Sequence, residues 1–177
     1  MHELVLREVD DSEVCIRCIC SPLHVKAKTG TLKREAFLPP PNKREVSLLR
    51  LRYTDLNFAK SHAKSLKLTD QTYWGLASIV KSDIKSVQIE DDAFSVDILG
   101  TPISKDKKYI PVNISVYSDD EGLPMHADLI YSEFADANEV KTQMRKFANI
   151  LVKIAKHRKD DNVDQSDWSM GDFTKGE

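Results

Sequence analysis

The feature that most constrains this fold is a long apolar stripe near the C-terminal end of the chain. Between about Ala137 and His157, apolar residues recur every three or four positions, the spacing that places side chains on one face of an α-helix. Asp136, followed three residues later by Glu139, predicts a capping box at the helix start. Such a helix must bury its stripe against another element. The stripe contains Val140, Met144, Phe147, Ala148, Leu151, Ile154 and Ala155.

Short segments rich in β-branched residues predict the sheet that this helix covers. Two short strands are expected between Glu3 and Cys20, on either side of the acidic turn DDSE. A second helix is predicted from Asp55, as N-cap, to about Leu66. Further strands are predicted at residues 46–53, 75–80, 94–99, 109–117 and 123–131.

These elements predict an α+β fold. We expect a single domain at residues 1–159, with an antiparallel or mixed sheet of about five to seven strands and two helices. The C-terminal helix should pack across the sheet. Residues 160–177 follow as an acidic tail.

The last two predicted strands form the clearest candidate hairpin. Both alternate apolar and polar residues, and their aliphatic rows align on one face only if Ser118 pairs with Leu123. In that register the reverse face carries Ser115 opposite His126, with Asp128 two residues further along the second strand.

Two interpretations of this polar face remain open. Antiparallel sheets often leave one face in water, which predicts that replacing His126 costs no more than about 0.5 kcal/mol of stability. Alternatively, His126 acts as a base, with Asp128 setting its tautomer and Ser115 beside it. The two side chains on one strand run parallel and do not converge, which favours the first interpretation.

His24, in SPLHVK, extends the catalytic alternative. Together with His126 and basic residues, it would suit cleavage of a phosphodiester. His24 also follows the three cysteines Cys15, Cys18 and Cys20, which offer a metal alternative. A second ligand pair is missing from the sequence, so core packing of the cysteines is favoured and no metal or cofactor is expected.

Charge is distributed unevenly along the chain. Between His24 and Lys67, eleven Lys and Arg face three acidic residues, whereas the whole chain carries a net charge of −2. Such a block favours an anionic partner, either nucleic acid or an acidic protein. Arg50 and Arg52 alternate on a predicted strand and are expected to act together on one anion. The predicted binding residues are Lys26, Lys28, Arg34, Lys43, Arg44, Arg50, Arg52, Lys60 and Lys64.

The acidic tail has the composition of a docking segment. Its acids are interleaved with Trp168 and Phe173, which are expected to anchor it on the protein's own basic stretch or on a partner. Because the core helix ends before residue 160, deletion of the tail is expected to leave the fold intact if the tail docks between molecules.

These patterns favour a binding or assembly component without enzymatic activity. The alternative is a small hydrolase that uses His24 or His126. The sequence contains neither a secretory signal nor an apolar run long enough to span a membrane, which predicts a soluble cytoplasmic protein.

Overall fold

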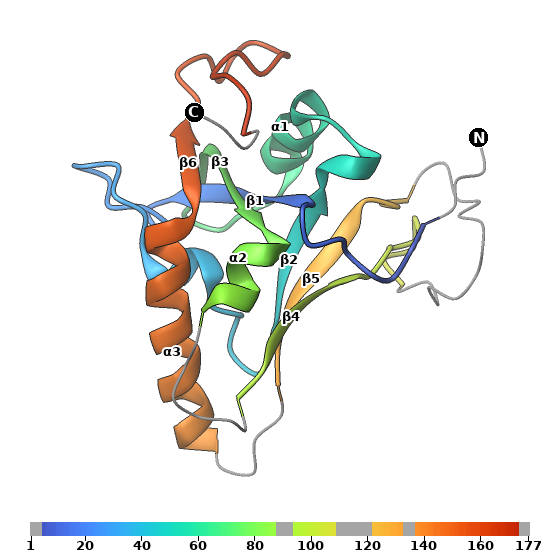
Figure 1. Ribbon diagram of the computed structural model, residues 1–177. Helices are drawn as coiled ribbons and strands as arrows, with labels where there is room; N and C mark the ends of the chain where they lie inside the picture. The colour runs from blue at the N-terminus through green and yellow to red at the C-terminus, as the bar shows by residue number, and fades with distance from the viewer. Residues whose placement is uncertain (1–4, 88–93, 109–121, 133–136, 174–177) are drawn as a thin grey trace.

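One antiparallel sheet organises the chain. The computed structural model describes residues 5–87, 94–108, 122–132 and 137–173, in which six strands lie in the order β4-β5-β2-β1-β3-β6 (Figure 1). The strands are β1 (Val14–Ser21), β2 (Glu45–Arg50), β3 (Thr72–Val80), β4 (Val96–Gly100), β5 (His126–Tyr131) and β6 (Lys156–Lys159). The helices are α1 (Leu56–Ser65), α2 (Lys81–Ser86) and α3 (Ala137–Ile154), with short 3₁₀ helices at Arg34–Phe37 and Leu51–Tyr53. The predicted α+β class is therefore confirmed.

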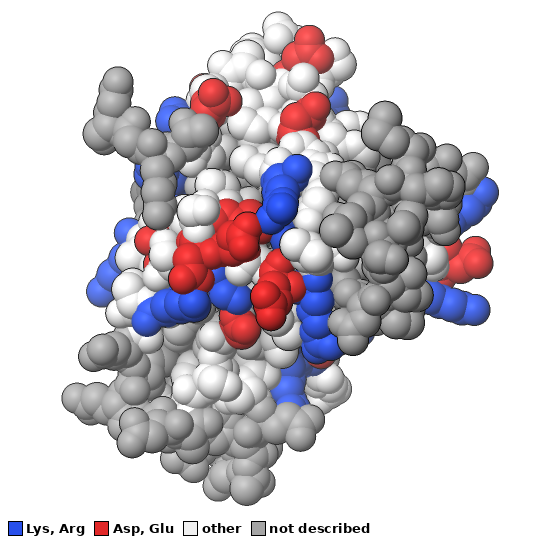
Figure 2. Space-filling view, turned by 45° about the vertical axis from the view of Figure 1, so that its right-hand side comes forward, with Lys and Arg blue, Asp and Glu red and all other residues white. Residues whose placement is uncertain are grey.

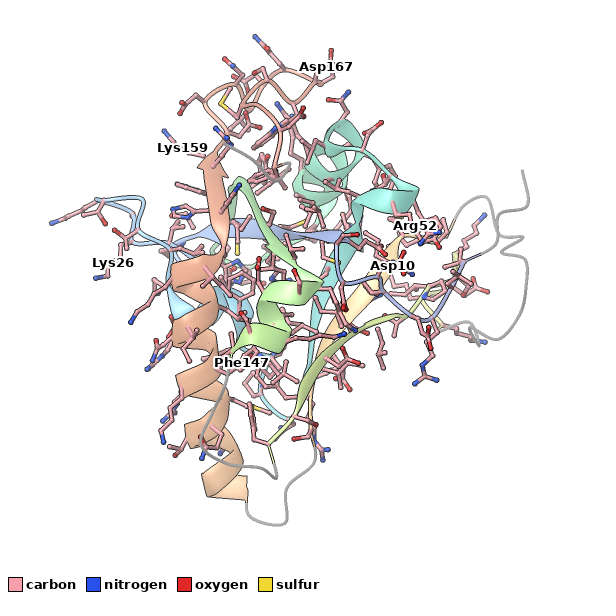
Figure 3. The ribbon with its side chains drawn as sticks, in the orientation of Figure 1. Asp10, Lys26, Arg52, Phe147, Lys159 and Asp167 are labelled. Atoms are coloured by element: carbon pink, nitrogen blue, oxygen red, sulfur yellow. The ribbon has the colours of Figure 1, made fainter. Side chains whose placement is uncertain are left out.

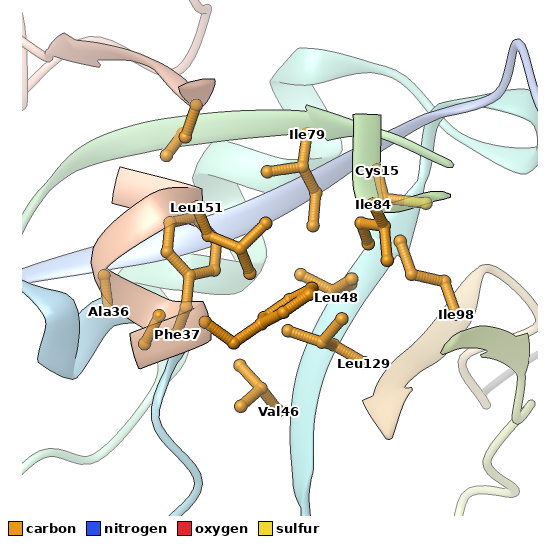
Figure 4. Close-up of a cluster of buried hydrophobic side chains, with 14 of the residues drawn as sticks. Cys15, Ala36, Phe37, Val46, Leu48, Ile79, Ile84, Ile98, Leu129 and Leu151 are labelled. Atoms are coloured by element: carbon orange, nitrogen blue, oxygen red, sulfur yellow. The ribbon is translucent and has the colours of Figure 1, made fainter. Parts of the chain in front are cut away.

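The helix α3 covers one face of the sheet, as its stripe predicts. Phe147 and Leu151 pack with Phe37, and the Tyr131 hydroxyl donates to the Phe37 carbonyl at 2.6 Å (Figures 3 and 4). Phe147 also meets Tyr131 edge to face, with ring centroids 5.8 Å apart. The predicted cap at Asp136 lies outside the described residues.

The opposite face of the sheet carries α1. Alternate residues of β1 enter two separate apolar clusters: Cys15 and Ile19 lie on the α3 side, whereas Ile16 packs with Ala59 and Ala63 of α1. The predicted N-cap of α1 is confirmed, because the Asp55 carboxylate accepts a hydrogen bond from the Phe58 N–H at 2.8 Å. The inner strands of the sheet are therefore covered on both sides.

The C-terminal helix ends earlier than predicted. It stops at Ile154, and Lys156–Lys159 forms the edge strand β6, paired with β3 from Ser78 to Gly75. All four side chains of β6 are exposed. The apolar stripe runs out at Ala155, so the remaining residues have no core to bury and gain more from pairing their backbone with β3 than from another helical turn.

The predicted hairpin register is wrong. The backbone N–H and C=O of Leu123 both pair with Ile103. Along its length β5 pairs with β2 on one side and with β4 on the other, so both of its edges are occupied. Residues 109–121, with the candidate Ser115, lie outside the described residues. Alternation showed which side chains share a face, but it carries no information about the neighbouring strand.

Candidate functional site

A polar cluster lies on the α1 side of β5. The Thr101 hydroxyl donates to Asp128 Oδ2 at 2.8 Å, and His126 Nδ1 donates to the Thr101 carbonyl at 2.8 Å. His126 Nε2 lies 3.9 Å from Asp128 Oδ1, too far for a hydrogen bond. Thr101 thus holds both residues, a link that the sequence pattern did not suggest.

This cluster is buried, which contradicts the expected wet face. The exposed fraction is 4% for His126 and 2% for Asp128. Burial lowers the pKa of His126, an effect that Asp128 opposes. Burial and the nearby His126 also lower the pKa of His62 on α1. The arrangement keeps a neutral imidazole in a structural network between sheet and helix.

The burial of His126 reverses the expected effect of its removal. The substitution His126→Ala should lower the free energy of unfolding by about 2–3 kcal/mol, because it opens a cavity and removes the polar partner of Thr101. Urea denaturation measures this loss. A matched substitution of the exposed His157 to Ala should change stability by no more than about 0.5 kcal/mol. Equal effects of the two substitutions would show that the polar face is open to water.

His24 belongs to a different place in the fold. It lines a cavity of about 190 Å³ with Cys18, Cys20, Gln71 and Tyr73, and His126 does not line that cavity. The Cys20 N–H donates to His24 Nδ1 at 3.2 Å, and the Cys20 thiol donates to Gln71 Oε1 at 2.7 Å. His24 and His126 therefore do not share the pocket that the hydrolase alternative requires.

The environment of His24 and Cys20 disfavours the charged forms that a reactive cysteine-histidine pair needs. Burial, aided by the charges of Arg17 and Lys33, lowers the pKa of His24 to about 3. Burial also raises the pKa of the Cys20 thiol. A neutral thiol beside a neutral imidazole lacks the thiolate of an activated nucleophile. Among the described residues, no group of three or more His, Cys, Asp or Glu side chains is arranged to hold a metal ion.

Arg50 is part of the core. Its side chain is fully buried, with Nε 2.5 Å and Nη2 2.9 Å from the two carboxylate oxygens of Glu13. It also donates to the carbonyls of Leu6 and Glu8. Burial therefore corrects the prediction that Arg50 binds an external anion together with Arg52.

Arg52 points elsewhere because β2 ends at Arg50 and the chain turns into the 3₁₀ helix Leu51–Tyr53. Its Nη1 lies 2.7 Å from Asp10 Oδ2, and both side chains are largely exposed. Both arginines lie over the Tyr53 ring, at 4.7 Å from its centre for Arg50 and 5.7 Å for Arg52. Strand alternation does not continue past the end of the strand.

Charged groups near Arg52 are mostly paired with each other. A cavity of about 570 Å³ is bordered by acidic residues and by two lysines of α2, Lys81 and Lys85. Lys81 pairs with Asp97, and Lys85 lies 2.5 Å from Asp11. Figure 2 shows acidic and basic side chains interleaved on one face of the molecule. Arg52, Lys81 and Lys85 thus pair with three of the acidic side chains that line the cavity, Asp10, Asp97 and Asp11, and the lining keeps an excess of acidic residues over lysines.

Lys60 and Lys64 are used by the tail of the chain itself. Lys60 is fully buried, and its ammonium group lies 3.0 Å from Asp160 Oδ2 in an ion pair. It also donates to the carbonyls of Asn162 at 2.8 Å and Asp167 at 3.0 Å. Lys64 donates to the Val163 carbonyl. Three of the contacts of these two lysines with the tail are hydrogen bonds to backbone carbonyls. The contact of Lys60 with Asp160 is an ion pair with a tail carboxylate.

The two tail aromatics differ in burial. Phe173 is 2% exposed and packs in the α1-side cluster with Leu49 and Leu76, whereas Trp168 is half-buried. The rings stack with centroids 5.9 Å apart. The tail therefore contacts α1 of its own chain.

The remaining predicted basic residues divide between two regions. Lys43 and Arg44 lie just before β2, and Arg34 pairs with Glu35 at 3.5 Å. Lys26 and Lys28 lie on an exposed loop closed by a bridge between Val25 and Leu32.

The loop that carries Lys26 approaches Trp74 of β3, and the Trp74 ring lies near His157 of β6. A methyl group added at Gly30 would lie 3.4 Å from the Trp74 ring, and Trp74 lies 6.0 Å from the ring of His157 on β6. Lys26 and Lys159 lie on the same side of the molecule in Figure 3. We call this region the loop-strand surface; it consists of Lys26, Lys28, Trp74, His157 and Lys159. Sequence reasoning missed the β6 part because it extended the helix to His157 and predicted no strand after it.

Neither a protein-family model, nor a curated protein, nor a solved structure matches the chain. Within the described residues, no helix is long and apolar enough to cross a membrane.

Proposed function

We propose that the protein is a binding component that engages single-stranded nucleic acid at the loop-strand surface. The observation that carries the proposal is the contact of Trp74 with both the lysine-bearing loop and the basic edge strand β6. An aromatic ring flanked by cationic side chains provides the two interactions that single strands use, stacking of bases and neutralisation of phosphates.

The charges at this surface are accessible. Lys26 and Lys28 are exposed and form no ion pair with any described residue. On β6, Lys159 is exposed and pairs with Asp161 at 3.3 Å in a contact that water screens. A phosphate can therefore approach these groups without breaking a buried interaction.

The same residues also suit a second purpose, since basic side chains on an edge strand discourage pairing with another chain. That role applies to β6 alone and does not explain the exposed lysines Lys26 and Lys28 on the loop. The hydrolase alternative gains no support from His24 or His126, because both are buried in separate networks. An acidic protein would form ion pairs with the lysines, but it has no nucleic-acid bases to stack on Trp74.

Charge reversal in the loop tests the proposal. The double substitution Lys26→Glu and Lys28→Glu should weaken binding of a fluorescein-labelled oligothymidylate at least about tenfold at low salt, because two phosphate contacts are lost and two repulsions are added. The slope of log affinity against log salt concentration should become shallower by roughly 0.7 for each lost contact. Fluorescence anisotropy measures both quantities.

The matched control reverses two exposed lysines outside the loop-strand surface, Lys43→Glu and Lys67→Glu. It makes the same change in net charge and should weaken binding much less. Equal losses in the two double variants, or no binding by the unaltered protein, would overturn the proposal. Binding of polyglutamate in preference to the oligonucleotide would assign the surface to an acidic protein instead.

A further inference from the structure

A recess lies between the first turn of α1 and the tail. It has a volume of about 400 Å³, near the lower end of the range of ligand pockets, about 300–1,000 Å³. We call it the tail recess; its lining includes Asp55 and Asn57 from the start of α1 and Trp168, Asp172 and Phe173 from the tail.

The aromatic wall of the tail recess is held in place. The Trp168 N–H donates to Asn57 Oδ1 at 2.8 Å, and its indole Nε1 donates to the Gly171 carbonyl at 2.8 Å. The ring also stacks on Phe173, with an interplanar angle of 26°. The first of these bonds holds the Trp168 backbone and the other two contacts hold the ring, so the ring loses little conformational freedom when a ligand binds against it.

The charge of the lining has one sign. Asp55 and Asp172 contribute two carboxylates, and the lining contains no Lys or Arg. Asp55 Oδ1 accepts the Phe58 N–H, and neither carboxylate forms an ion pair with a described residue. A fixed indole ring beside two carboxylates favours a cation that can both stack and form a charge pair.

We propose that the tail recess binds an arginine side chain presented by a partner protein. Arginine suits this site better than lysine, because its planar guanidinium stacks on aromatic rings and donates to carboxylates. A related arginine contact occurs beside the recess, where the second partner is a backbone carbonyl and not a carboxylate. The Arg158 guanidinium lies 5.8 Å from the centre of the Phe173 ring and donates to the Asp172 carbonyl at 3.4 Å. This site is separate from the loop-strand surface, so the inference does not depend on the proposed function.

Short peptides test the inference directly. Acetyl-Gly-Arg-Gly-amide should shift the indole N–H signal of Trp168 in a two-dimensional NMR titration, with millimolar affinity typical of a single side chain. Acetyl-Gly-Lys-Gly-amide should bind more weakly, and acetyl-Gly-Gln-Gly-amide should leave the signal in place. No shift with the arginine peptide, or an equal shift with the glutamine peptide, would overturn the inference.

Removal of the two charges provides the second test. Asp55→Asn with Asp172→Asn should weaken binding of the arginine peptide about fivefold or more, because cation-π and charge-pair contributions act together. Asparagine also caps helices, so α1 keeps its N-cap. The matched control is Asp164→Asn, an exposed tail residue outside the recess. Equal affinities of the double variant and the control would show that the carboxylates do not hold the peptide.

Discussion

Replacing Arg50 with methionine should lower the free energy of unfolding by about 3–5 kcal/mol, the largest effect expected of any single substitution on the sheet. The guanidinium is fully buried, and its loss leaves the buried carboxylate of Glu13 without a counterion. It also leaves the carbonyls of Leu6 and Glu8 without their donor. Urea denaturation at neutral pH measures the loss.

Arg52 provides the matched control for this prediction. It lies two residues away and forms an ion pair of its own, but its side chain is 43% exposed and that of its partner Asp10 is 66% exposed. Arg52→Met should therefore cost less than about 1 kcal/mol. The double variant Arg50→Met with Glu13→Leu should recover much of the stability, because no unpaired charge remains buried. If Arg50→Met and Arg52→Met cost the same, Arg50 is not part of the core.

Lys60→Met should have an effect of similar size, about 3–5 kcal/mol, together with release of the tail. The lysine contacts three oxygens of the tail, and its partner Asp160 is 1% exposed. Without the ammonium group, Asp160 becomes a buried charge without a counterion. Urea denaturation measures the stability, and limited proteolysis after residue 160 measures release of the tail.

Lys64→Met is the control on the same helix. Lys64 is exposed and donates one hydrogen bond, to the Val163 carbonyl, so its loss should cost about 1 kcal/mol or less. A tail as resistant to proteolysis in Lys60→Met as in Lys64→Met would contradict the anchoring role of Lys60.

The burial of Phe173 also changes the expectation for a deletion of residues 160–177, which should now destabilise the fold by exposing the α1-side cluster.

The secondary structure could be predicted where one local pattern had one physical solution. The stripe that contains Phe147 and Leu151 can be buried only as a helix, and α3 forms there. Asp55 caps α1 through an interaction that spans three residues. Both predictions succeeded because their energetics are local to a few neighbouring residues.

The candidate site was harder to predict, because its contacts join distant parts of the chain. Thr101 holds His126 across 25 residues, and Lys60 reaches Asp167 across 107. Alternation in residues 123–131 correctly placed His126 and Asp128 on one face, but it did not indicate that this face is covered. A polar side chain is compatible with water or with a buried hydrogen-bond network, and its type alone does not distinguish them.

The sequence by itself determined the α+β class, the helix that crosses the sheet and the composition of a tail able to dock, because periodicity and side-chain type act over short stretches. Only the tertiary structure decided which charges are available to a partner. Arg50 and Lys60 carry the same formal charge as Lys26, but Glu13 and Asp160 form ion pairs with them inside the protein. Lys26 remains exposed on its loop, and no described carboxylate pairs with it. Burial is a property of the assembled chain, and the cost of burying a charge makes the position of its counterion decisive.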